Sequence, residues 1–278
     1  MNFNSILAVS DFTTNSEHAL ERAALLAQQH RATLRLVFYA EERHPFLSDP
    51  IARLEQRARQ LARRTHATVH TVQKTCSIDD VLTEARTADL LVMGPLTHRN
   101  WKKFHRGTTL DQAVHGSMCP LLVVKREPAS VYERVLVAID LSPLSTKLID
   151  IGRRFCKTSE LRLFHAIDTI EDSRLRMADA SFESIQAHRI GSRLHARDRL
   201  SQLVGALEEQ HPAFAYEIGN GDPAYAAALH QHATQAELVV VGRRKSSTLE
   251  RLVTGSVAQR LAKWAQSDVL VAPLEARR

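Results

Sequence analysis

The stretch Ile6-Leu7-Ala8-Val9-Ser10-Asp11 has the pattern of a buried β-strand that ends in an aspartate, and the pattern returns as Val135-Leu136-Val137-Ala138-Ile139-Asp140. A hydroxyl residue stands two positions after each aspartate, at Thr13 and Ser142. Short, continuously apolar runs are typical of strands that are buried on both faces of a parallel sheet. The recurrence of this run 129 residues later therefore predicts that one folding unit is written twice in the chain.

Further strands and helices recur in the same order in both halves. Second apolar runs lie at residues 34–38 and 161–165, fourth runs at 88–94 and 236–242, and closing runs at 121–124 and 269–272. We expect third strands near residues 68–72 and 214–218. Strands that alternate with helices indicate parallel βα units with helices on both faces of one sheet. Each half is therefore predicted to be an α/β domain with an open five-stranded, Rossmann-like parallel sheet.

The second half is longer than the first, because the offset between matching runs grows by 19 residues after the second strand. We place this insertion near residues 168–212, where apolar side chains spaced by three and four predict one long or two shorter amphipathic helices. These apolar residues are Phe182, Ile185, Leu194, Leu200, Leu203, Val204 and Leu207. Core packing is the default role of the insertion, and a lid or a partner-binding helix is the alternative. The short polar connection at 126–133 predicts domains at residues 1–126 and 133–278.

Composition narrows the class of protein. The chain has 278 residues, 44% of them hydrophobic and 24% charged, and its apolar runs are too short to cross a membrane. With no signal-peptide pattern at residues 1–4, we expect a cytoplasmic protein. Three widely spaced cysteines, Cys76, Cys119 and Cys156, argue against a disulfide framework, and no metal site is predicted. The net charge of +6 suits a polyanionic partner without selecting one.

A glycine-containing loop follows the fourth strand of each half. Gly94 precedes Gly107-Thr108 at the same spacing at which Gly242 precedes Gly255-Ser256. The first glycine lets the backbone turn sharply, and the second stands directly before a helix whose free amide groups can receive phosphate oxygens. Since ligands of open parallel sheets bind beyond the carboxyl ends of the strands, these loops are the predicted ligand sites.

The loops resemble the signature of the universal stress protein family, which reads Gly, two residues, Gly, nine residues, Gly, then Ser or Thr. The resemblance covers essentially the whole chain: Asp11 and Asp140 match the aspartate that ends the family's first strand, and Met118-Cys119-Pro120 resembles the turn before its closing strand. It implies two tandem domains whose closing strands pair to form a pseudo-twofold intrachain dimer. Protein partners and a homodimer of the whole chain are further interactions that fit such a protein.

In nucleotide-binding members of this family, the first-strand aspartate and the second strand hold the adenine end, and the glycine loop holds the phosphates. The resemblance implies that the second half binds through Asp140, Ala166, Gly242, Gly255, Ser256 and Val257. In the first half it implies Asp11, Tyr39, Gly94, Gly107, Thr108 and Thr109. The expected ligand is ATP or another adenine nucleotide, accompanied by magnesium, or another phosphate anion.

Both halves depart from the signature at its second glycine, which is Thr97 in the first half and Lys245 in the second. A side chain at this position can occlude the pocket, whereas Lys245 can instead supply a positive charge. Arg243 and Arg244 also favour an anion in the second half, so we rank the second site above the first. The alternative for Asp11 and Asp140 is a purely structural Asx turn.

We predict a universal stress response protein that binds nucleotide without efficient catalysis. Slow ATP hydrolysis is the most that we expect, because the sequence contains no GxxxxGK[ST] phosphate loop and no GxGxxG fingerprint. The runner-up is a stress-response scaffold with degenerate nucleotide sites that acts through protein–protein contacts. Nucleic acid is not an expected partner: residues 101–106 mix aromatic and cationic side chains, but a solvated loop is the simpler interpretation.

Overall fold

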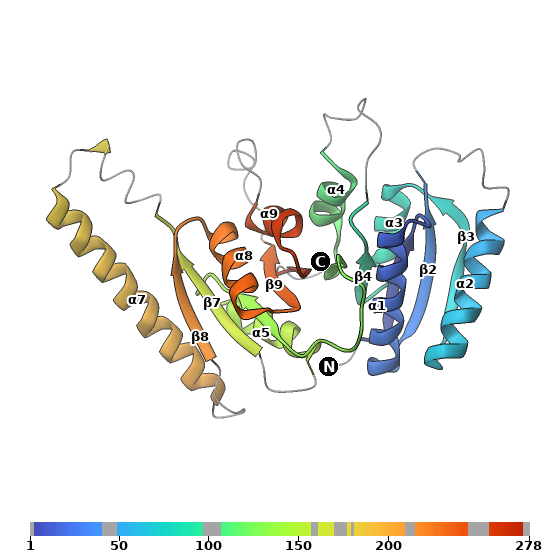
Figure 1. Cartoon of the computed structure of the whole chain (residues 1–278), viewed down its shortest axis with the longest axis horizontal. Helices are drawn as coiled ribbons and strands as arrows, with labels where there is room; N and C mark the ends of the chain where they lie inside the picture. The colour runs from blue at the N-terminus through green and yellow to red at the C-terminus, as the bar shows by residue number, and fades with distance from the viewer. Residues whose placement is uncertain are drawn as a thin grey trace. The chain divides into compact units, whose positions relative to one another are not determined.

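The computed structural model describes residues 3–40, 49–96, 107–156, 161–169, 177–178, 181–208, 215–243 and 256–274 (Figure 1). The chain divides into two compact units. The first comprises Met1–Val131, Arg243–Lys245 and Ser267–Arg278, and the second comprises Tyr132–Gly242 and Ser246–Gln266. The last strand of the chain therefore packs with the first unit, although it belongs to the second sequence repeat.

The first unit is built on a sheet in the strand order β3-β2-β1-β4-β5-β10. Its elements are β1 (Ser5–Ser10), α1 (Thr14–His30), β2 (Thr33–Tyr39), α2 (Pro50–Thr65), β3 (Val69–Cys76), α3 (Ile78–Ala85), β4 (Leu90–Met93), α4 (Thr109–Gly116), β5 (Leu121–Val123) and β10 (Asp268–Pro273). The strands β1 to β5 are parallel, and β10 runs antiparallel to β5. The predicted parallel α/β fold is confirmed, as is the pairing of the two closing strands.

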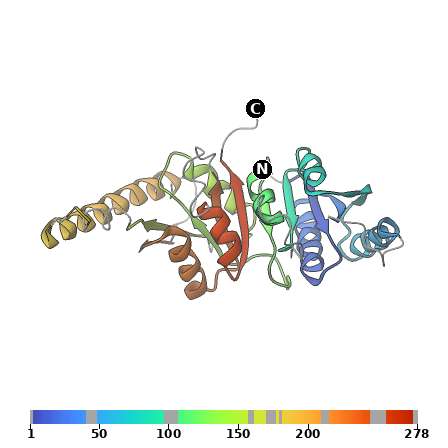
Figure 2. The ribbon, with the colours of Figure 1, turned by 90° about the horizontal axis from the view of Figure 1, so that it is seen from above.

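Helices cover both faces of this sheet (Figure 2). Helix α1 packs beside α2 on one face, and α3 packs beside α4 on the other. The strands β1 and β4 between these layers are almost entirely buried. This burial explains why their sequences read as continuous apolar runs rather than as alternating ones.

The second unit repeats the arrangement with the parallel strand order β9-β6-β7-β8. Its elements are β6 (Val135–Ala138), α5 (Ser145–Arg153), β7 (Leu161–Ile167), α7 (Phe182–Glu208), β8 (Ala215–Asn220), α8 (Pro223–Thr234), β9 (Leu238–Arg243) and α9 (Val257–Trp264). Strands β3 and β8 extend further than the predicted residues 68–72 and 214–218. Most of their side chains are exposed or half-buried, so an apolar pattern does not mark their ends.

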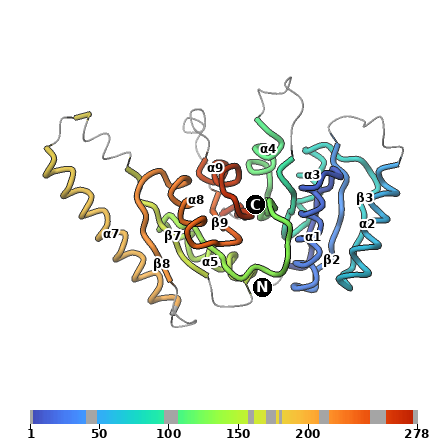
Figure 3. The backbone as a smooth tube through the Cα atoms, viewed as in Figure 1, coloured from blue at the N-terminus to red at the C-terminus, as the bar shows by residue number. Residues whose placement is uncertain are grey.

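Helix α7 contains much of the predicted insertion and forms one continuous helix along β8 (Figure 3). It has 27 residues, whereas the corresponding helix α2 of the first unit has 16. Its second half packs on the sheet through Ala196, Leu200 and Val204. Its first half buries Ile185, whereas Phe182 and Leu194 are exposed. The expectation that these two residues pack in the core was therefore wrong. Leu194 lies nine residues after the buried Ile185, which places the two on opposite sides of the helix.

A buried carboxylate connects β10 to the rest of the first unit. Asp268 is 1% exposed and accepts hydrogen bonds from the backbone amides of Lys125 (2.8 Å) and Arg126 (3.2 Å). The guanidinium of Arg22, which is itself buried, lies 3.6 Å from the same carboxylate. Burial lowers the pKa of Lys125 to about 8, although the charge of Asp268 opposes this shift. The Asp268 carboxylate thus balances the charge of a buried guanidinium. It also accepts hydrogen bonds from the two amides that follow β5.

Replacing Asp268 by alanine is expected to destabilise the first unit by about 3 to 5 kcal/mol, because it leaves the Arg22 charge buried and uncompensated. Denaturant unfolding followed by circular dichroism measures this loss. The matched control is Asp150→Ala, which removes an exposed carboxylate 3.8 Å from Arg153 and should cost about 0 to 1 kcal/mol. Equal losses in the two variants would contradict the role assigned to Asp268.

Candidate functional site

The two first-strand aspartates form the same turn in the two units. The Asp11 Oδ1 atom accepts a hydrogen bond from the Thr13 amide, and the Asp140 Oδ1 atom accepts one from the Ser142 amide, each at 3.0 Å. The residue after each aspartate has a left-handed backbone, with φ of 60° at Phe12 and 58° at Leu141. Bulky residues rarely adopt this conformation, which costs about 1 to 3 kcal/mol. The Asx turn is therefore present in both units, and its strained geometry is repeated.

The first glycine of the first loop is required by a close approach. A Cβ atom on Gly94 would lie 2.6 Å from the backbone oxygen of Asn15, in the first turn of α1. The strand β4 therefore ends against the start of α1, at the carboxyl edge where the ligand site is predicted. The equivalent Gly242 lies within β9 of the second unit.

The helix that follows the first loop begins with a carboxylate. Gly107 has a φ of 72°, and Thr108 caps α4 by accepting a hydrogen bond from the Asp111 amide at 3.2 Å. In return, Asp111 Oδ2 accepts hydrogen bonds from the Thr108 amide (2.9 Å) and hydroxyl (2.8 Å). This capping box places a negative charge among the amide groups predicted to receive a phosphate.

The helix that follows the second loop has the same capping box without the charge. Ser256 caps α9 by accepting a hydrogen bond from the Gln259 amide at 3.2 Å, and the Gln259 Oε1 atom accepts one from the Ser256 amide at 2.9 Å. Since the glutamine side chain is neutral, the positive end of the α9 dipole is not offset by its own capping residue.

The two units also differ where the second strand meets this helix. In the first unit the Tyr39 hydroxyl at the end of β2 lies 3.2 Å from the Thr109 hydroxyl at the start of α4, and both residues are buried. The corresponding residues of the second unit are Ala166 and Val257, which are both half-buried and have no hydroxyl groups. The structure therefore joins two predicted site residues in the first unit and leaves the equivalent position more accessible in the second.

The cation predicted to favour an anion at the second loop has a structural role. The Arg243 guanidinium donates hydrogen bonds to the backbone oxygens of His115 and Ser117, the latter at 2.6 Å, at the carboxyl end of α4. These carbonyls have no partner within the helix, so Arg243 serves as their cap. Arg243 therefore has a structural contact in the first unit, and its role toward an anion stays a prediction.

The first turn of α9 carries another arginine. The Arg260 Nη1 atom donates a hydrogen bond to Asp222 Oδ2 at 2.6 Å. Burial favours a higher pKa for Asp222, but the hydrogen bonds from the Tyr225 amide and from Arg260 outweigh it and lower the pKa. Asp222 also caps α8, so this ion pair connects the starts of α8 and α9.

Some predicted positions lie outside the described residues. These are Thr97, Arg244, Lys245 and Gly255, together with the loop at 101–106. Within the described ranges, no group of three or more His, Cys, Asp or Glu side chains is placed to hold a metal ion. Of the helices in these ranges, none is both long and apolar enough to cross a membrane.

The capping residues Asp111 and Gln259 were missed as contributors to the site. The patterns Thr108-x-x-Asp111 and Ser256-x-x-Gln259 are capping-box signatures that could have identified them. The contact of Tyr39 with Thr109 had no such signal, because the two residues are 70 positions apart and meet only through side-chain packing.

Two open α/β units of this topology, each with a capped helix at the carboxyl edge of its sheet, define a tandem Rossmann-like protein. A model of the universal stress protein family matches residues 2–125 and 131–273, so the chain belongs to this family. A universal stress protein of Mycobacterium tuberculosis is 23% identical over 214 residues, which cover 74% of this chain and 68% of the relative.

Single-domain and tandem relatives both align with the chain. A universal stress protein of Synechocystis is 26% identical over 151 residues, which cover 50% of this chain and 97% of the relative. The crystal structure of a universal stress protein from Archaeoglobus fulgidus aligns with a TM-score of 0.67 at 16% identity, covering 98% of this chain and 99% of that one. At this identity the structural match shows a shared fold alone and carries no information about a ligand.

Replacing Gly94 by alanine is expected to destabilise the first unit by about 1 to 3 kcal/mol, because the added Cβ would overlap the Asn15 carbonyl. Gly205→Ala in α7 is the matched control, since no atom lies within 4 Å of its added Cβ. That control should gain about 0.5 to 1 kcal/mol from the higher helix propensity of alanine. Denaturant midpoints compare the two variants, and an unchanged midpoint for Gly94→Ala would refute the close approach.

Proposed function

We propose that this universal stress protein binds an adenine nucleotide or another phosphate-bearing anion in its second unit, without efficient catalysis. The phosphates are received at the start of α9, beside Ser256 and Val257. The other end of the ligand lies at the carboxyl edge of the sheet, near Asp140 and Ala166. Lys245 and Gly255 belong to the same proposed loop, outside the described residues.

The difference between the two capping boxes is the observation that supports this proposal. A phosphate at the start of α4 would meet the Asp111 carboxylate, which already accepts hydrogen bonds from Thr108. At the start of α9 it would meet the neutral Gln259 amide group instead. Two unit charges about 4 Å apart repel by roughly 4 kcal/mol near a protein surface, which is enough to favour the second unit.

Accessibility of the adenine end supports the same choice. Asp140 is exposed and Ala166 is half-buried, whereas in the first unit the Tyr39 and Thr109 side chains meet in the equivalent place. The small Ala166 side chain leaves room for a planar ring to approach the end of β7. We therefore propose one functional ligand site for each chain.

The first unit has a different proposed role. Its Tyr39–Thr109 contact and its Asp111 cap fit a degenerate site, so we propose that this unit is a structural scaffold. This combines the two alternatives that the sequence left open, with binding assigned to one half and structural support to the other.

Isothermal titration of the chain with ATP, ADP and AMP in the presence of magnesium tests the nucleotide proposal. We expect at least one of the three nucleotides to bind with about one molecule per chain. Gln259→Glu introduces the charge that Asp111 supplies in the first unit, and it should weaken this binding about tenfold or more.

The control is Lys263→Gln, which lowers the net charge by the same amount. Lys263 lies in the last turn of α9, about 9 Å along the helix from its first residue, Val257. It should change the affinity much less than Gln259→Glu. Equal losses in the two variants would point to general charge attraction. The absence of heat with all three nucleotides would remove the nucleotide claim.

A further inference from the structure

A hollow lies in the second unit between the ends of β7 and β8 and helix α7. It has a volume of about 420 Å³, which is within the usual range for small-molecule sites. Its floor is formed by the carboxyl ends of β7 and β8, where Ile167 is paired with Asn220 in the sheet register. Its roof is formed by the first half of α7, through residues that include His188, Arg189 and Arg193.

Within the described residues of the first unit the corresponding helix α2 is shorter and has no matching turns. The buried residues Ala196 and Leu200 occupy the second half of α7, so the added turns precede the part that packs like α2. In the added turns Ile190 is 61% exposed and Leu194 is 57% exposed. Ile185 is the buried residue of these turns, so core packing accounts for only part of their position.

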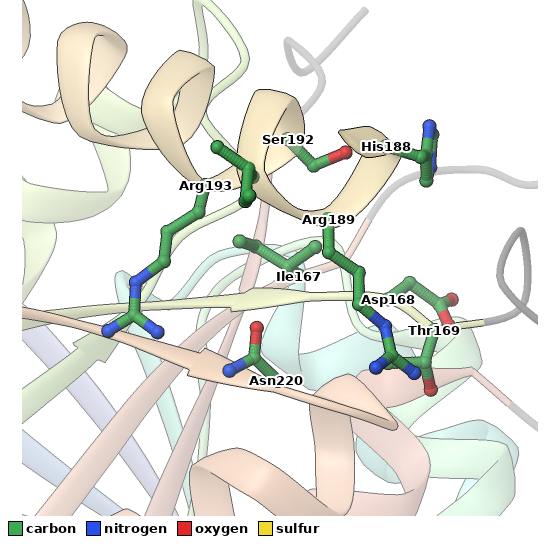
Figure 4. A pocket seen from close by; sticks show the side chains of 9 residues that line it. Ile167, Asp168, Thr169, His188, Arg189, Ser192, Arg193 and Asn220 are labelled. Atoms are coloured by element: carbon green, nitrogen blue, oxygen red, sulfur yellow. The ribbon is translucent and has the colours of Figure 1, made fainter. Parts of the chain in front are cut away.

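The charges around the hollow favour an anion. Figure 4 shows the Arg189 and Arg193 side chains extending from α7 toward the floor, with Asn220 below Arg193 and Asp168 near Arg189. The lining thus has two guanidinium groups and one carboxylate. Within the described residues Arg193 has no hydrogen-bond or ion-pair partner, whereas Arg189 has an interaction of its own.

The chemistry of a guanidinium favours phosphate over carboxylate as the anion. Figure 4 shows Arg189 and Arg193 extending toward opposite ends of the hollow, so Arg193 is the contact for a ligand at the Asn220 end. A terminal phosphate offers three acceptor oxygens and up to two negative charges, and guanidinium groups match its geometry in bidentate pairs. A single carboxylate offers two oxygens and one charge.

We propose that this hollow is a binding site for the phosphate group of a small phosphorylated molecule, with Arg193 as its main contact. The site is distinct from the proposed phosphate site at α9, although its floor residue Ile167 directly follows Ala166 at the proposed adenine end. The added turns of α7 then have a specific role, which is to place Arg193 above the edge of β7 and β8.

The test uses the full chain carrying Gln259→Glu, so that an anion at the start of α9 contributes less to the measured binding. Inorganic pyrophosphate is titrated calorimetrically at low ionic strength, with malonate as the carboxylate probe. We expect pyrophosphate to bind more tightly than malonate. Adding Arg193→Gln should weaken pyrophosphate binding about tenfold or more, because one charge-assisted contact is lost.

Arg197→Gln is the matched control. Arg197 lies one helical turn further along α7 and lines a neighbouring hollow with Tyr216 and Glu217. Arg193 lines both hollows, whereas Arg197 lines only this neighbouring one. Its replacement should leave pyrophosphate affinity nearly unchanged, and circular dichroism should show that both variants keep their helix content. Equal weakening by the two replacements, tighter binding of malonate, or no pyrophosphate binding would each overturn the proposal. Nucleotide titrations of the unaltered chain report on α9 separately, so failure of one site is distinguishable from failure of the other.

Discussion

The unpaired amide groups at the start of a helix are the constraint on which both ligand-site assignments at the carboxyl edge depend. A helix after a parallel strand begins there with amides that have no partner inside the helix. In the first unit Asp111 satisfies the Thr108 amide and adds a charge, and in the second Gln259 satisfies the Ser256 amide without one. Two copies of one fold can thus differ in ligand preference through a single capping residue, while the sheet beneath them remains the same.

The repeated apolar runs made the fold predictable, because strands such as β1 and β4 are buried on both faces. Predictions were weaker for strands at the sheet edge: β8 has mostly exposed or half-buried side chains, so its end carried no apolar signal. The contact of Arg243 with the end of α4 was not predicted, because a cation beside a glycine loop has the same sequence pattern whether it binds an anion or caps a helix. The left-handed backbone at Leu141 had no signal either, since glycine and asparagine are the residues that usually mark it.

The two units differ in the side chains at the carboxyl edge of the sheet, but both keep the strained turn after the first strand. Phe12 and Leu141 retain nearly the same backbone angle, although neither residue favours it. A conformation that costs energy persists only where the surrounding structure requires it. Each turn directs the chain from the end of the first strand into the following helix. By contrast, the Tyr39–Thr109 contact occurs in one unit, so the side chains above the sheet have changed more freely than the turn that supports them.

Because β10 belongs to the first unit, the boundary between the sequence repeats is not the boundary between the folded units. The polar connection near residue 130 separates the sequence repeats, but the first unit is completed only by residues from the far end of the chain. A polypeptide released at that connection would leave the hydrogen-bonding edge of β5 open, and such edges promote association with other strands. During synthesis the sheet of the first unit is therefore completed only after residues 268–273 have been made.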